Sequence, residues 1–151
     1  MKVLITGITG FVGSHLVDYI LKEHEEDRIF GLVRWRSPLV NIKHVLDRVT
    51  LCRGDLNDQG SLVRLLARIK PDLIFHLAAQ SYVVESFHCP ISTLQTNILG
   101  TANLLEAVNI IDINPTIHIC SSSEVYGQVK ESDTPITEDC PLRPASPYGV
   151  S

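Results

Sequence analysis

An apolar run that leads directly into three evenly spaced glycines constrains this chain more than any other feature. The run Val3–Thr6 is followed by Gly7, Gly10 and Gly13 in the segment TGITGFVGSHL, after which the pattern becomes helical. Glycine serves such a turn in three ways: a tight bend, a close backbone approach to a pyrophosphate, and close packing of helix on strand. The helix start also offers free N–H groups and a positive dipole end to phosphates. The segment predicts a dinucleotide-binding turn, with an ordinary strand–helix turn as the alternative.

Apolar runs and amphipathic stretches alternate along the rest of the chain. Strands are predicted at Val3–Thr6, Ile29–Val33, Val49–Arg53, Asp72–Leu77 and Thr116–Ser121. Three helical stripes lie between them, formed by Val12, Leu16, Tyr19 and Ile20, by Leu62, Leu65, Leu66 and Ile69, and by Ile98, Ala102, Leu105 and Val108. Strands that are almost wholly apolar are typical of a parallel sheet covered on both faces. The repeated units predict a doubly wound α/β fold with right-handed crossovers.

Composition narrows the class of protein. A chain of 151 residues has the size of one domain, and its net charge of −4 gives no reason to expect a nucleic acid or membrane partner. No apolar run approaches the roughly 18 residues that span a bilayer. The apolar stretch before the first glycine, in MKVLITG, is too short for a signal peptide. The four cysteines form no CxxC pair, so we expect a cytoplasmic protein with reduced, mostly buried thiols and no metal site.

The end of the second predicted strand bears on cofactor choice. A site for NAD places Asp or Glu about 20 residues after the glycines, where it binds the ribose hydroxyls. This chain has Arg34 and Arg36 there, in the run VRWRS. Guanidinium groups attract a 2′-phosphate and bind it in bidentate fashion, which favours NADP over NAD. Solvated loop arginines are the alternative, and Trp35 is open to stacking on adenine or to contact with a neighbouring subunit.

Polar residues cluster where the fourth and fifth strands end, at the sheet edge where such folds bind ligands. The fourth strand leads into HLAAQS (76–81), in which Ala78 and Ala79 leave room for a cofactor. The fifth leads into CSSSEVYG (120–127), which brings three serine hydroxyls and the Glu124 carboxylate. A capped helix start is the other interpretation of that cluster. Tyr148 favours chemistry, since a phenol can act as acid or base.

These motifs together resemble the extended short-chain dehydrogenase/reductase family. The resemblance rests on TGxxGFxG, the GDL at 54–56, HLAAQS, the NxxGT at 97–101, SSSEVYG and SPYGVS, and covers the whole chain. It implies a doubly wound, parallel-sheet Rossmann domain over residues 1–151 that is incomplete at its C-terminal end. Within the family the chain is most similar to the branch of 4,6-dehydratases that act on GDP-mannose, through RWRS, AAQS and Ser-Ser-Glu before Val-Tyr-Gly.

The family pattern implies roles for particular residues. Phe11 and Val12 would join the three glycines at the pyrophosphate. The other implied cofactor contacts are Asp55 and Leu56 at the adenine, and Leu77, Ala78, Ala79, Asn97 and Tyr148. The implied catalytic residues are Ser122, Glu124 and Tyr148, and the implied substrate contacts are Ser81, Ser122 and Ser123. A loop cap for Asp55 and a buried packing amide for Asn97 are the structural alternatives.

In the family a lysine follows the catalytic tyrosine by four positions, and its charge favours the phenolate. That position lies one residue beyond Ser151, so we expect a chain that continues into further strands and a sugar-nucleotide domain. The shorter chain is then expected to have little or no activity and an exposed sheet edge at its fifth strand. The resemblance also implies a homodimer or homotetramer for the complete protein.

The resemblance implies an internal redox dehydration of a nucleotide sugar through bound NADP. Tyr148 takes the proton of the hydroxyl at sugar carbon 4, Ser122 hydrogen-bonds the oxygen, and Glu124 removes the proton at carbon 5. Ser123 stands where some dehydratases of other nucleotide sugars carry Asp, which agrees with the GDP-mannose branch. The polar, proline-bearing segment 128–145 is expected to fold over the substrate. The alternatives are a GDP-4-keto-6-deoxymannose reductase, a nucleotide-sugar 4-epimerase and a non-catalytic NADP sensor.

Overall fold

Five parallel strands form the sheet of the computed structural model, which describes residues 1–151. The strands are β1 (Lys2–Thr6), β2 (Arg28–Val33), β3 (Thr50–Arg53), β4 (Leu73–His76) and β5 (Thr116–Ile119). Their spatial order is β3-β2-β1-β4-β5, and every neighbouring pair is parallel. All five predicted strands are confirmed, with small shifts at their ends.

The helices divide between two units of the chain. The first unit comprises residues 1–78 and 99–120, and the second comprises residues 79–98 and 121–151. The first unit contains α1 (Phe11–Glu23), the 3-10 helix η1 (Val40–Val45), α2 (Gln59–Ile69) and α5 (Gly100–Ile111). The second contains α3 (Val83–His88), α4 (Pro90–Leu94), the 3-10 helices η3 (Ser123–Tyr126) and η4 (Glu131–Asp133), and α6 (Pro147–Val150). The π-helical turn η2 (Gln95–Leu99) lies at the boundary.

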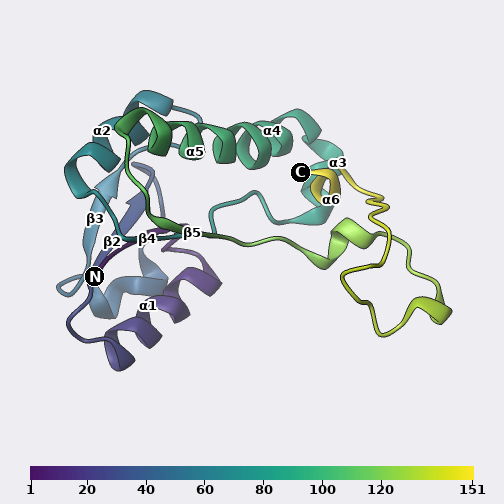
Figure 1. The fold of residues 1–151 in the computed structure, drawn as a ribbon, viewed down its shortest axis with the longest axis horizontal. Helices are drawn as coiled ribbons and strands as arrows, with labels where there is room; N and C mark the ends of the chain where they lie inside the picture. The colour runs from purple at the N-terminus through teal and green to yellow at the C-terminus, as the bar shows by residue number, and fades with distance from the viewer. The chain divides into compact units, whose positions relative to one another are not determined.

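Helices cover both faces of the sheet in the first unit (Figure 1). Side chains alternate along β1, so that Val3 and Ile5 pack in the cluster formed with α1 and η1. Leu4 points the other way, into the cluster formed with α2 and α5. This two-sided core is the doubly wound α/β arrangement that the sequence predicts.

The apolar stripe predicted on α2 is confirmed, whereas that predicted on α1 is confirmed only at Leu16 and Ile20, which pack in the core. Leu62, Leu65, Leu66 and Ile69 are all buried, as predicted. On α1, Val12 and Tyr19 are more than half exposed, and the buried face includes Gly13 and Ser14. These small residues let α1 lie close to the turn that connects it to β1. A pattern of large apolar side chains does not indicate such close packing.

The stripe predicted along α5 is wrong except at Val108. The helix buries Leu104, Ala107 and Val108 and leaves Leu105 and Ala102 exposed. The helix is apolar on more than one face, so its periodicity alone does not identify the side that meets the sheet.

The cysteines differ in part from expectation. All four are free thiols, but only Cys52 is buried, while Cys89 and Cys120 are exposed. The pKa of Cys89 is raised by a hydrogen bond with the Glu85 side chain and by its negative charge. None of the helices combines the length and the apolar character that crossing a bilayer requires.

Candidate functional site

The glycine turn joins β1 to α1 through a conformation that requires glycine. Gly7 has a positive φ of 75°, and a Cβ there would lie 2.8 Å from the backbone nitrogen of Ala78. A Cβ on Gly13 would lie 2.2 Å from the carbonyl oxygen of Gly7, so helix and turn touch backbone to backbone. Gly10 begins α1 without a side-chain cap, and the first turn carries no acidic residue. The free N–H groups at the start of α1 are therefore open to an anion.

The turn lies where the direction of strand order reverses. The chain proceeds outward from β1 to β2 and β3 and then returns to β4 on the other side of β1. Ligands of open α/β sheets bind at the carboxyl ends of the strands at this point. Leu77 and Ala78 follow β4 there, and their N–H groups donate to the carbonyl and the hydroxyl of Thr6.

A buried histidine holds this strand end together. The Nδ1 atom of His76 lies 2.8 Å from the hydroxyl of Thr6, and its Nε2 lies 2.9 Å from the hydroxyl of Thr101. Burial lowers the pKa of His76, because the charged ring would lose its hydration. The neutral ring links β1, β4 and α5. Sequence reasoning assigned His76 no role, although a histidine that ends an apolar strand is a signal for such a network.

The loop after β2 carries the two predicted arginines. The N–H of Arg34 donates to the hydroxyl of Ser37, and the N–H of Ser37 donates to the carbonyl of Arg34, which closes a turn. The guanidinium of Arg36 lies 4.3 Å from the centre of the Trp35 ring. Trp35 is 73% exposed, so this stacked pair is displayed on the surface.

The loop after β3 holds Asp55 and Leu56. Asp55 accepts a hydrogen bond from the N–H of Asn57 through its carboxylate, as a loop cap does. Leu56 is buried against the start of α5, where a Cβ on Gly100 would lie 2.9 Å from the leucine Cβ. Their predicted contact with adenine stays a prediction.

The second unit contains the hydroxyl- and carboxylate-bearing segment. Ser122 is half-buried and is the N-cap of η3, where its hydroxyl accepts a hydrogen bond from the N–H of Glu124. Ser123 and Glu124 are exposed, so both side chains are accessible to a ligand. The interpretation as a capped helix start therefore describes the backbone correctly and leaves the side chains free for chemistry.

Tyr148 belongs to the short helix α6, which packs against η3, α3 and α4. Ser146 caps the helix by accepting from the N–H of Gly149. A Cβ on Gly149 would clash with the carbonyl oxygen of Glu124. The elements that carry Tyr148 and Glu124 are thus in backbone contact.

A buried amide joins three segments of the second unit. The Oδ1 of Asn97 accepts from the N–H of Gln80 at 2.8 Å. Its Nδ2 donates to the carbonyl of Gln80 and to the hydroxyl of Ser151, the latter also at 2.8 Å. This network fits the structural alternative for Asn97, and its contact with cofactor stays a prediction. Ser81 and Ala79 are exposed beside it.

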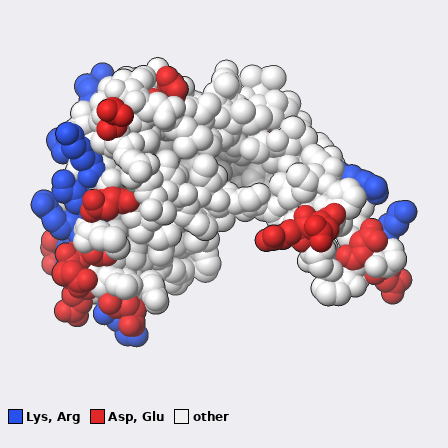
Figure 2. All heavy atoms as spheres, viewed as in Figure 1, with Lys and Arg blue, Asp and Glu red and all other residues white.

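The segment predicted to cover substrate forms a closed loop. The N–H of Arg143 donates to the carbonyl of Val125, and a Cβ on Gly127 would overlap the carbonyl of Arg143, so the two ends of the loop are held together. Between these ends the chain is mostly exposed. Figure 2 shows acidic side chains gathered over this part of the second unit. No three His, Cys, Asp or Glu side chains group as a metal site would require.

The chain matches known proteins over almost its whole length. A sequence model of the GDP-mannose 4,6 dehydratase family matches residues 4–151. The chain is 42% identical to the GDP-mannose 4,6-dehydratase sdnI of Sordaria araneosa, over 97% of this chain and 27% of that protein. It is 39% identical to the GDP-6-deoxy-D-mannose reductase of Pseudomonas aeruginosa, over 99% of this chain and 43% of that protein.

The fold is shared with a solved nucleotide-sugar enzyme. The crystal structure of Thermus thermophilus UDP-glucose 4-epimerase, in complex with NAD, superimposes with a TM-score of 0.86 at 32% identity. The match covers 99% of this chain and 47% of that one. The chain therefore spans less than half the length of each of these relatives.

Proposed function

We propose that this chain, which belongs to the GDP-mannose 4,6-dehydratase family, is the nicotinamide-binding part of a nucleotide-sugar 4,6-dehydratase. The observation that carries the proposal is the contact between α6 and η3, which joins the helix of Tyr148 to the segment of Ser122 and Glu124. A phenol, a hydroxyl and a carboxylate are the acid–base groups that removing water from a sugar requires.

The first unit fits a dinucleotide. The glycine turn would hold the pyrophosphate at the uncapped start of α1, where Phe11 and Val12 are exposed. Arg34 and Arg36 would bind a 2′-phosphate, which makes NADP the proposed cofactor rather than NAD. A nicotinamide held there would supply reversible hydride transfer, from carbon 4 of the sugar and back to carbon 6, with no net redox change.

The residues of the second unit would move the protons. Tyr148 takes the proton from the hydroxyl at carbon 4, and Ser122 hydrogen-bonds the oxygen as it becomes a ketone. Glu124 removes the proton at carbon 5, which the new ketone has made acidic. The two protons taken up by Tyr148 and Glu124 balance the two that are then delivered: one to the hydroxyl at carbon 6, which leaves as water, and one back to carbon 5 when carbon 6 receives the hydride. Each positioned acid or base contributes about 10²- to 10⁴-fold in rate.

The substrate we propose is GDP-mannose, and the product is GDP-4-keto-6-deoxymannose. The family match and the 42% identity to a protein of that activity support this choice. We also propose that the protein is cytoplasmic and that it forms a homodimer or homotetramer. Light scattering on the purified protein tests the oligomeric state.

A reductase is the second candidate, because the Pseudomonas aeruginosa relative of that activity is almost as similar. In a reductase Tyr148 would donate its proton to the ketone oxygen at carbon 4, and Glu124 would have no proton to remove.

One assay separates the two candidates. The protein in its longest natural form is incubated with GDP-mannose and a catalytic amount of NADP. Formation of a 4-keto-6-deoxy sugar without net use of NADPH supports the dehydratase. Turnover only when a 4-keto sugar and stoichiometric NADPH are supplied supports the reductase. Absence of both reactions, in protein that binds neither NADP nor NAD, contradicts the proposed function altogether.

A further inference from the structure

Two positive charges face each other at the amino ends of β1 and β2. The strand register places Lys2 directly opposite Arg28. Like charges opposite each other on neighbouring strands repel and destabilise a sheet. The pair lies at the edge of the sheet opposite the glycine turn, since the turn follows the carboxyl end of β1.

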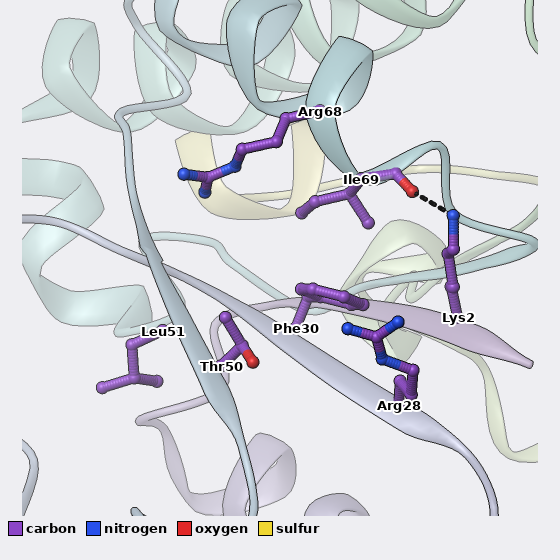
Figure 3. Close-up of a pocket in the computed structure, with 7 residues that line it drawn as sticks. All are labelled: Lys2, Arg28, Phe30, Thr50, Leu51, Arg68 and Ile69. Atoms are coloured by element: carbon purple, nitrogen blue, oxygen red, sulfur yellow. Dashed lines mark hydrogen bonds between the residues drawn. The ribbon is translucent and has the colours of Figure 1, made fainter.

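A third cation completes a pocket at this edge. Arg68, in the last turn of α2, lines the same pocket from above, and its guanidinium points away from Lys2 toward β3, which carries Thr50 and Leu51 (Figure 3). The three basic side chains line a cavity of about 380 Å³ together with Phe30, Thr50, Leu51 and Ile69. No carboxylate lines it. Figure 2 shows Lys and Arg side chains along the outer edge of the first unit, with Asp and Glu side chains among them.

The contacts of these cations leave most of their donors unused. The ammonium of Lys2 donates to the carbonyl of Ile69 at 2.9 Å. A guanidinium nitrogen of Arg68 lies 3.2 Å from the thiol sulfur of Cys52, which is a weak acceptor. The guanidinium of Arg28 lies 5.7 Å from the centre of the Phe30 ring. None of the three forms an ion pair with a carboxylate.

The helix dipole explains only part of this arrangement. The C-terminal end of α2 attracts positive charge, which accounts for Lys2 and Arg68. Arg28 is the first residue of β2, and it joins the other two cations in a chain whose net charge is −4. Arginine binds phosphate oxygens through parallel N–H donors, and lysine adds a point charge.

We propose that this pocket binds the phosphate group of a small phosphorylated molecule, at a site separate from the cofactor site. The volume is sufficient for a diphosphate with a sugar or base attached, since ligand pockets begin at about 300 Å³. Bound phosphate would offset the repulsion between Lys2 and Arg28. The site depends on neither the glycine turn nor the catalytic segment.

The test is calorimetric titration of the protein with pyrophosphate at low salt, with and without saturating NADP. Saturating NADP would fill the site proposed at the glycine turn, so pyrophosphate that still binds would report on the pocket. We expect one pyrophosphate per chain in the presence of NADP. Arg28→Gln and Arg68→Gln should weaken this binding by about ten- to a hundredfold, because each removes a charge-assisted hydrogen bond. Arg64→Gln, on the exposed side of α2, is the matched control and should bind as the unmodified chain does.

Three results would overturn the proposal: no binding at millimolar pyrophosphate, complete loss of binding when NADP is added, or equal weakening by all three arginine variants. Circular dichroism tests whether each variant is folded. If either Arg28→Gln or Arg68→Gln fails to fold, the other still tests the pocket. Titration with ADP identifies the source of the phosphate, since tighter binding than pyrophosphate indicates a nucleotide and equal binding indicates the phosphate alone. If NADP does not bind, the proposed function is contradicted. The pyrophosphate affinities of Arg28→Gln and Arg64→Gln would still show whether the pocket binds phosphate.

Discussion

A Cβ atom on Gly149 would lie 2.8 Å from the carbonyl oxygen of Glu124, closer than such atoms approach in proteins. The residue that follows the proposed catalytic tyrosine is therefore glycine because α6 lies directly on η3. Because Gly149 has no side chain, the backbone next to Tyr148 can lie in contact with the backbone of Glu124.

Replacing Gly149 with alanine should push α6 away from η3. We expect unfolding in urea to show a loss of about 1–3 kcal/mol, the usual cost of overpacking, and a larger fall in kcat than in NADP affinity. Gly60→Ala is the control, since Gly60 is exposed on α2 and only the ends of side chains lie near it. Gly60→Ala should raise the free energy of unfolding by about 0.5–1 kcal/mol, because alanine loses less conformational freedom than glycine when a helix forms. A Gly149→Ala protein as stable and active as the original would show that the contact is not needed.

Glu124→Gln tests the proposed base. The side chain is exposed, so we expect the folded structure and NADP binding to be unchanged. Formation of the 4-keto-6-deoxy product should fall by about 10²- to 10⁴-fold, because an amide cannot take the proton at carbon 5. Glu131→Gln changes an exposed carboxylate in the neighbouring η4 and should have no effect. Full turnover by Glu124→Gln would exclude this residue as the base.

Arg34→Asp should reverse the cofactor preference. A carboxylate repels the 2′-phosphate of NADP and accepts from the ribose hydroxyls of NAD. Trp35 is the only tryptophan in the chain and lies in the same loop, so its fluorescence reports on binding. We expect the NADP to NAD affinity ratio to fall by at least about tenfold, the effect of one charge-assisted contact. An unchanged ratio would place the 2′-phosphate elsewhere.

The buried histidine predicts a fall in stability on acidification. Because burial lowers the pKa of His76, the unfolded chain binds a proton first as the pH drops below about 6.5. The free energy of unfolding should therefore decrease below that pH, by at most about 1.4 kcal/mol per pH unit from this one group. His76→Asn should be less stable at pH 7.5 and less sensitive to pH between 7.5 and 5.5. His24→Asn, at an exposed position, is the control and should leave the pH dependence of stability unchanged. A His76→Asn protein with the original pH dependence would show that His76 is not its source.

The strands were predictable because each is a short apolar run bounded by polar or glycine residues. The glycine turn was equally clear, since strand, glycine spacing and helix occur in the required order. In contrast, the apolar surface of α1 extends around the helix, and small Gly13 and Ser14 decide which side meets the sheet. Hydrophobic periodicity does not register such close backbone packing.

Features that depend on register or on distant segments were not predictable. The opposition of Lys2 and Arg28 follows only from the alignment of β1 with β2. The bonds of Asn97 to Gln80 and Ser151 join residues far apart in the chain. A polar amide within an apolar helical run was the one available signal, and it did not reveal the partners.

The Val125–Arg143 hydrogen bond separates the intervening loop from the packing of η3 and α6. Residues inserted or deleted between these two anchors would alter the loop while leaving the acid–base elements in place. The length of the loop between Val125 and Arg143 can therefore change independently of the contact that holds η3 against α6.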